Sequence, residues 1–272
     1  MSGRTNPLLL FPAFLRRDFF AHLSYRLKAA LDLLSIVIYV ASFYFIAKLV
    51  GRTEIMAPYG GDYFPFVLIG IALSAYQSVG LRCFSQSIRE EQFMGTLESV
   101  LAAPVSVSSF LLASAQWDFL YATVEAGGYL LAGVFLFGAA LPAANFSAAA
   151  VIAFLTLCTL LSLGILSAAF IVKFKRGDPV AWLLTAVSEL LGGVFFPTSL
   201  LPGSLRTISR FIPMTYSLDG LRLALLKGAS VSDVMPYAWT LAAFTAILMP
   251  AGVLAFRKAL DSARREGSLG HY

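Results

Sequence analysis

The chain has 272 residues, of which 13% are charged, whereas a soluble domain carries about 25%. Hydrophobic residues make up 58% of it and fall in blocks long enough to cross a bilayer, which excludes a soluble protein and a β-barrel of short alternating strands. The net charge of +5 is spread over several loops, so the positive-inside rule explains it without nucleic acid. The composition therefore predicts an all-α polytopic membrane protein.

Residues 1–28 are expected to form a cytoplasmic amphipathic helix at the membrane interface. Phenylalanine and leucine recur there at helical spacing among arginine, lysine and histidine, a mixture typical of a helix in the headgroup layer. The first membrane span is predicted over 29–50. A polar link follows, and the second span is predicted over 63–84.

The run from Arg89 to Pro104 is the most charged short stretch of the chain, and it separates two long apolar segments. Gly95 supplies a turn and Thr96 is a favourable N-cap for a helix that begins at Leu97. Pro104 ends this helix, since the residue before a proline is disfavoured in the α region. A helix this short is unstable alone, so we expect it to dock on a partner. The alternative is an amphipathic loop that rests on lipid headgroups.

The rest of the chain is predicted to contain four more spans and a segment of two short re-entrant helices. The spans cover 105–137, 147–172, 180–196 and 235–256, and the short helices cover 204–212 and 217–226 within the segment 197–234. The predicted domains are therefore the interfacial helix 1–28, a membrane domain 29–256 and a basic tail 257–272. Six spans leave both termini on one side, which holds 14 of the 20 Lys and Arg residues and is therefore expected to be cytoplasmic.

The sequence lacks the motifs of common enzymes and nucleotide-binding proteins. It contains no phosphate-binding loop, no metal-ligand cluster and no nucleophile elbow. The run Asp219-Gly220-Leu221-Arg222 is similar to the start of a lipid-headgroup transferase motif, but the later paired aspartates are missing. Intramembrane acids are costly and often functional, so Glu125 and Glu189 either line a substrate path or form helix–helix hydrogen bonds.

Three segments together resemble the membrane-spanning subunit of ABC transporters of the ABC-2 type. The first is the run Glu90-Glu91 with Gly95-Thr96-Leu97-Glu98 and Pro104. The second is Gly193-Val194-Phe195-Phe196-Pro197 at the end of the fifth predicted span. The third is Leu201-Pro202 with Ile212-Pro213-Met214-Thr215-Tyr216, leading to Leu221-Arg222. The resemblance covers nearly the whole chain.

The resemblance implies that 89–104 is a coupling segment that docks on a cytoplasmic ATPase, and that two permease and two ATPase copies form the working unit in a bacterial inner membrane. ATP and Mg would bind the partner ATPase, and this chain would hold no cofactor and have no ATPase activity of its own. The implied ATPase contacts are Glu90, Glu91, Gly95, Thr96, Leu97, Glu98 and Leu101. The candidate substrate path is Glu125, Glu189 and Tyr216.

The Gly-Thr-Leu-Glu run is more similar to the branch that exports drugs, lipids and small molecules than to polysaccharide exporters. The latter carry a basic-aromatic-Pro-Arg pattern that this chain lacks. Two other classes stay open from the residues alone: a proton-coupled secondary transporter that uses Glu125, and a membrane enzyme that uses Asp219.

Overall fold

The computed structural model describes residues 7–95, 107–141, 144–174 and 179–265. These residues are almost entirely helical, and the described part contains no strand beyond one isolated bridge between Arg52 and Asp62. This confirms the all-α class. The elements in chain order are α1 (Pro7–Ser24), α2 (Arg26–Val50), η1 (Glu54–Tyr59), α3 (Tyr63–Phe93), α5 (Val107–Phe137), α6 (Phe146–Phe174), α7 (Pro179–Leu191), η2 (Thr198–Leu200), α8 (Gly203–Ser209), α9 (Pro213–Lys227) and α10 (Val231–Arg265).

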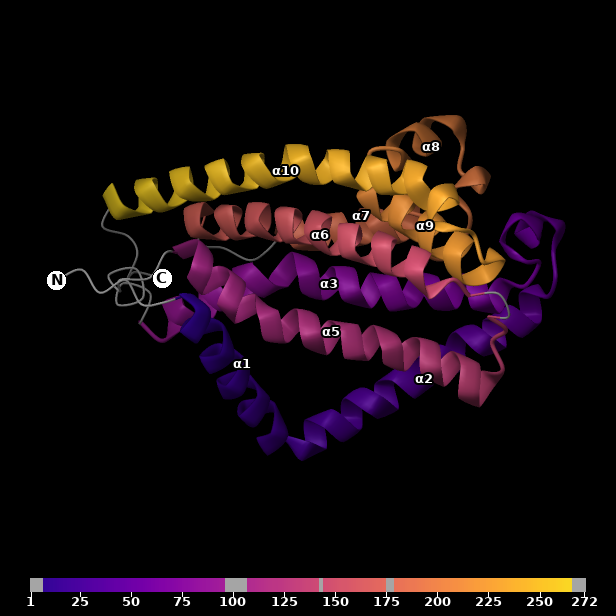
Figure 1. Cartoon of the computed structure of the whole chain (residues 1–272), viewed down its shortest axis with the longest axis horizontal. Coiled ribbons are helices and arrows are strands. Elements are labelled where there is room, and N and C mark those ends of the chain that lie inside the picture. The colour runs from indigo at the N-terminus through magenta and orange to yellow at the C-terminus, as the bar shows by residue number, and fades with distance from the viewer. Residues whose placement is uncertain (1–6, 96–106, 142–143, 175–178, 266–272) are drawn as a thin grey trace.

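The long helices α3, α5, α6 and α10 form an elongated bundle in which α5 runs opposite to the other three (Figure 1). We call the end where α3 stops and α5 starts the α3–α5 end, and the opposite end, where η1 lies, the η1 end. The helix α3 packs on both α5 and α6, and α6 packs along α10. The bundle is thus organised around α3 and α6.

Glycines set how closely these helices approach. A Cβ atom on Gly164 of α6 would lie 2.5 Å from the carbonyl oxygen of Gly80 on α3, and one on Gly133 of α5 would lie 2.2 Å from the side chain of Leu68. Membrane helices lack a hydrophobic drive to associate with each other, so they rely on such close backbone packing. The observed spacing of α3 and α6 therefore requires glycine at position 164, whereas at position 133 the flexible end of the Leu68 side chain would have to move.

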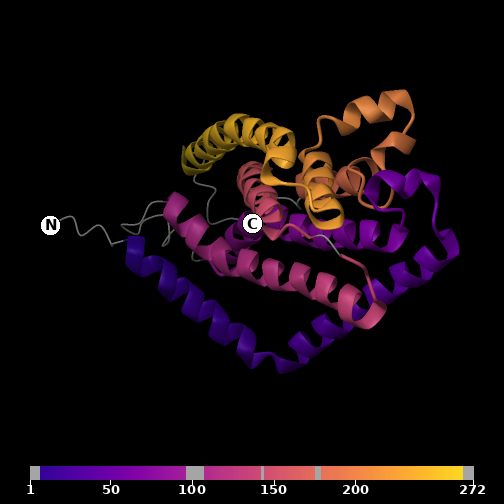
Figure 2. The ribbon, with the colours of Figure 1, turned by 45° about the vertical axis from the view of Figure 1, so that its right-hand side comes forward.

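The helices α1 and α2 form a V on one side of the bundle (Figures 1 and 2). The bend falls at Tyr25, which leaves the helical region with φ −103° and ψ 60°. Both helices contact α5, and α2 also contacts α3. Most of α2 faces away from the protein, since only Ile36, Val40 and Ala47 are buried along it.

The region after α6 departs from simple spans. The helix α7 has 13 residues, about 20 Å, which is shorter than the roughly 30 Å of a bilayer core. The prediction of a span to residue 196 was too long, because the chain turns after Leu191 and Gly193 takes φ +87°. The short helices α8 and α9 then follow close to the predicted ranges.

Four helices of the described residues, α2, α3, α6 and α10, are long and apolar enough to cross a membrane. The 31 residues of α3 measure about 46 Å, which exceeds the bilayer core by about 16 Å. Its first 19 residues, 63–81, carry no charge, whereas Arg82, Arg89, Glu90 and Glu91 follow. The α3–α5 end of α3 therefore projects beyond the hydrocarbon.

Candidate functional site

The projecting end of α3 carries the first part of the predicted coupling segment. Glu90 is exposed and Glu91 partly so, and the helix ends at Phe93. The amide of Met94 still donates to the carbonyl of Glu90 at 2.9 Å, and Gly95 then adopts φ +68°. The predicted turn at Gly95 is therefore present, and it takes a left-handed conformation that favours glycine.

Two large apolar side chains lie exposed at this turn. Phe93 is 69% exposed and Met94 is 72% exposed, beyond the apolar part of α3. The sequence analysis did not select either residue, because both precede the Gly95 turn and lie outside the short helix predicted from Leu97. The predicted contacts Thr96, Leu97, Glu98 and Leu101 lie outside the described residues, so the coupling helix itself stays a prediction.

Glu189 is held by a contact between two helices. On α7 its Oε1 accepts a hydrogen bond from Ser74 Oγ of α3 at 2.8 Å, and the residue is half-buried. Gly192, just after α7, has no room for a Cβ, which would lie 2.4 Å from the carbonyl oxygen of Ser188. The sequence left two interpretations of Glu189 open, and the structure contains the hydrogen bond between helices that one of them predicts.

Glu125 lies on α5, where that helix meets α2. It is half-buried, and Asp32 of α2 lies near enough to interact with it electrostatically. Asp32 itself accepts a hydrogen bond from Tyr121 of α5 at 2.6 Å. Two acids thus share this interface, and within the described residues no hydrogen bond engages the Glu125 carboxyl group.

Tyr216 lies on α9, away from both acids. Its hydroxyl donates to the carbonyl of Arg210 at 2.9 Å, and its ring packs against Phe244 of α10 at a centroid distance of 6.0 Å. In the described part of the chain no hydrogen bond, ion pair or ring contact joins any two of Glu125, Glu189 and Tyr216. The structure therefore assigns the three candidate path residues to separate contacts.

A buried arginine holds the turn after α7. Arg222 of α9 is only 1% exposed, and its guanidinium donates to the carbonyl oxygens of Phe66, Gly193 and Val194 at 2.8–3.2 Å. Its charge also lies 3.4 Å from the centre of the Phe66 ring, which favours a cation. A Cβ on Gly70 would lie 2.2 Å from the Val194 oxygen, so α3 needs glycine there.

The neighbourhood of Arg222 includes Tyr59 of η1. The Tyr59 hydroxyl donates to Asp219 at 3.4 Å. Burial, and then the negative charge of Asp219, raise the pKa of Tyr59 to about 12. Asp219 and Arg222 thus tie α9 to η1 and α3, which is a structural role and gives no support to an enzyme site at Asp219.

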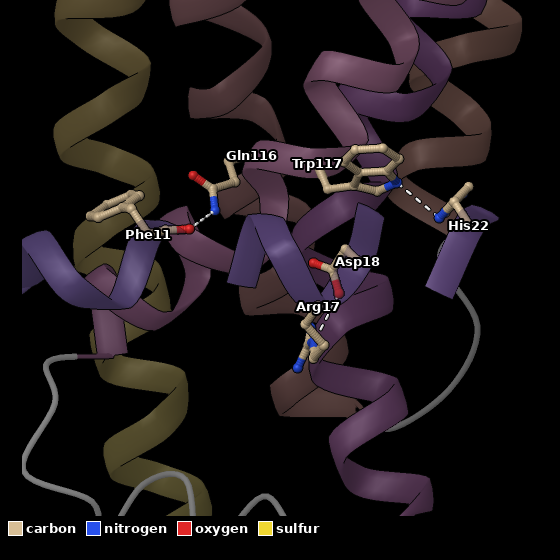
Figure 3. A network of polar contacts seen from close by, with 6 residues as sticks. All are labelled: Phe11, Arg17, Asp18, His22, Gln116 and Trp117. Atoms are coloured by element: carbon tan, nitrogen blue, oxygen red, sulfur yellow. Dashed lines mark hydrogen bonds and ion pairs between the residues drawn. The ribbon is translucent and has the colours of Figure 1, made fainter. Parts of the chain in front are cut away.

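A polar cavity of about 500 Å³ lies between α1, α3 and α5 at the α3–α5 end. Figure 3 shows one wall of it, where α5 reaches toward α1: Trp117 Nε1 donates to His22 Nδ1 at 2.9 Å, and Gln116 donates to the backbone oxygen of Phe11. Arg17 and Asp18 of α1 form an ion pair at 2.7 Å. Charged side chains on this wall therefore come from a helix that the sequence predicted to lie at the membrane interface.

The sequence analysis missed the roles of Arg222 and of His22. Arg222 stood within the segment that carries the family resemblance, but its three carbonyl partners are 28 to 156 residues away in the sequence. His22 is paired with Trp117 across 95 positions. Only the tertiary fold brings these groups together, although an arginine in an apolar segment is a signal that it has buried partners.

Comparison with known proteins agrees with this architecture. Residues 11–226 match the model of the ABC-2 type transporter family. The linearmycin resistance permease protein LnrN of Bacillus subtilis (strain 168) is 26% identical over 171 residues, which are 63% of this chain and 44% of that protein. The chain thus matches less than half the length of this relative. The family match covers most of the chain and includes α2, α3, α5, α6, α7 and α9, so this protein belongs to the ABC-2 type transporter family.

Proposed function

We propose that this chain is the membrane-spanning permease of an ABC exporter, driven by a separate ATPase that docks on the 89–104 segment. The observation that carries the proposal is the projecting end of α3. It brings acidic residues, the exposed Phe93 and Met94, and the Gly95 turn to a site beyond the hydrocarbon. A partner protein would cover these apolar side chains and pair with the acids.

The arrangement of α3 suits mechanical coupling. The helix is continuous over 31 residues, from the η1 end to the coupling segment, and it packs on α5 and α6 along the way. A push on its projecting end would therefore reach the core of the bundle. We propose that closure of two ATPase copies on ATP and Mg moves this end in each of two permease copies.

The proposed substrate class is a drug, lipid or other small molecule. LnrN is named as a resistance permease, and the Gly-Thr-Leu-Glu run has the pattern of that branch. We also propose that the protein exports its substrate, that it lies in the bacterial inner membrane, and that both of its termini are cytoplasmic. The charge bias of the loops supports the orientation.

A pull-down tests the docking site. We would purify tagged protein from native membranes in mild detergent and compare it with the double variant Leu97→Asp/Leu101→Asp. The matched control is Leu205→Asp/Ile208→Asp, which places the same charges on exposed apolar residues of α8. The proposal requires an ATPase that copurifies with wild type and control and is lost from the folded 97/101 variant.

If no ATPase copurifies with any form, the docking proposal is wrong, and a proton-coupled transporter becomes the better hypothesis. The observation that favours this second candidate is the pair of Asp32 and Glu125 at the α2–α5 interface. Flux driven by a pH gradient in proteoliposomes, lost in Glu125→Gln, would then be expected. Inside-out vesicles with ATP would report the direction of transport for the first candidate.

A further inference from the structure

The polar cavity at the α3–α5 end contains charged side chains of both signs, only some of which pair directly with each other. Six charged residues line it: Arg17, Asp18, Lys28, Arg82, Glu90 and Asp118. Arg17 and Asp18 pair with each other, and Glu90 accepts a hydrogen bond from Gln86 at 3.3 Å. Within the described residues, no hydrogen bond or ion pair engages the side chains of Lys28, Arg82 or Asp118, although Lys28 lies near enough to Asp118 to interact with it electrostatically.

An unpaired carboxylate beside an apolar core is costly, because burial removes part of its water. Asp118 is half-buried on α5, yet it opens on the cavity. Arg82 and Lys28 are exposed and open on the same space from α3 and α2. A ligand that carries both a positive and a negative group would satisfy these charges at once.

The cavity lies at the level of the lipid headgroups. The uncharged part of α3 ends at residue 81, and the next residue, Arg82, lines the cavity. The hydrocarbon of a bilayer corresponds to such uncharged stretches, and charged side chains begin at the headgroups. The α1 wall is the helix whose composition fits that layer.

We propose that this cavity binds the zwitterionic headgroup of a phospholipid that carries a primary ammonium group, such as phosphatidylethanolamine. The ammonium would donate to Asp118, and the phosphate would accept from Arg82 and Lys28. A volume of 500 Å³ equals roughly 17 waters at about 30 Å³ each, so it has room for the whole headgroup and some water.

The aromatic residues of the cavity disfavour a quaternary ammonium such as choline. An open aromatic cage would bind choline by cation–π contacts. The rings of Trp117 and Tyr121, however, both pack on His22, at centroid distances of 5.1 and 5.3 Å. Choline has no N–H donor for Asp118, so the site should prefer the primary ammonium.

Native mass spectrometry of the purified protein tests this preference, with dioleoyl lipids that differ only in the headgroup. Wild type should retain phosphatidylethanolamine in preference to phosphatidylcholine. Asp118→Asn should weaken the binding of phosphatidylethanolamine by about tenfold, as expected for the loss of one charge-assisted contact, and leave the binding of phosphatidylglycerol unchanged. Arg82→Gln should weaken the binding of both lipids, because both contain the phosphate.

The matched controls are Glu54→Gln and Arg206→Gln, which remove exposed charges from η1 and α8. Equal retention of phosphatidylethanolamine and phosphatidylcholine by wild type would overturn the proposal, as would an equal loss in control and cavity variants. Arg82 is exposed, so its variant keeps the test valid if Asp118→Asn does not fold. Soluble glycerophosphoethanolamine should compete only weakly, and competition as strong as that of the lipid would assign the cavity to a free metabolite. None of these results depends on an ATPase partner.

Discussion

Replacement of Arg222 by methionine should destabilise the protein by about 3 kcal/mol. Methionine fills a similar volume but donates no hydrogen bond, so the carbonyls of Phe66, Gly193 and Val194 lose their guanidinium donors. At about 1 kcal/mol for each carbonyl, the sum is about 3 kcal/mol. The variant no longer buries a charge, which offsets part of this loss in stability. It also loses the cation–π contact with Phe66, which adds to the loss.

The assay is equilibrium unfolding in mixed micelles of mild detergent and SDS, followed by tryptophan fluorescence. Arg222→Lys should lie between wild type and Arg222→Met, since an ammonium group keeps the charge and three donors but lacks the planar fork. Arg206→Met on α8 is the control, because that arginine is exposed. If Arg222→Met unfolds at the same SDS fraction as wild type and control, the bonds to the turn after α7 contribute nothing and our reasoning is wrong.

Three further predictions concern other contacts. Gly164→Val should cost about 1–3 kcal/mol in the same unfolding assay, because its Cβ would lie 2.5 Å from a carbonyl oxygen of α3. Trp117→Phe removes the hydrogen bond to His22, and α1 should become more sensitive to limited proteolysis while the melting temperature changes little. Tyr59 has its pKa raised to about 12, so the stability that its protonated form contributes is complete below about pH 10 and is lost as the pH rises toward 12. Tyr59→Phe should remove that alkaline loss, as measured by melting temperature against pH.

Each of these predictions has a control. Gly127→Val adds the same side chain where a Cβ meets nothing within 4 Å, and it should be neutral. Trp239 is 70% exposed, so Trp239→Phe should leave the proteolysis of α1 unchanged. An alkaline loss of stability that persists in Tyr59→Phe would trace the pH dependence to other groups.

The sequence was sufficient for the membrane class and for most helices. Long apolar runs exceed what a soluble core needs, so they locate α2, α3, α5, α6 and α10 without a structure. Proline and glycine likewise located the two short helices before α10, because Pro202-Gly203, Pro213 and Gly228 fall at their ends. Gly95 was predicted as a turn for the same local reason, and it has φ +68°.

The tertiary structure decided where the apolar segments stop being membrane spans and how polar groups pair. The chain turns after Leu191, where Gly193 takes φ +87°, and Arg222 from a distant helix donates to the carbonyls of Gly193 and Val194 in this turn. The pairing of Glu189 with Ser74, and the charges that gather between α1, α3 and α5, also join residues far apart in the chain. Local patterns fix what each segment can form, because propensity and hydrophobicity act over a few residues. Long-range pairing depends on which helices pack together, and only the assembled bundle sets that.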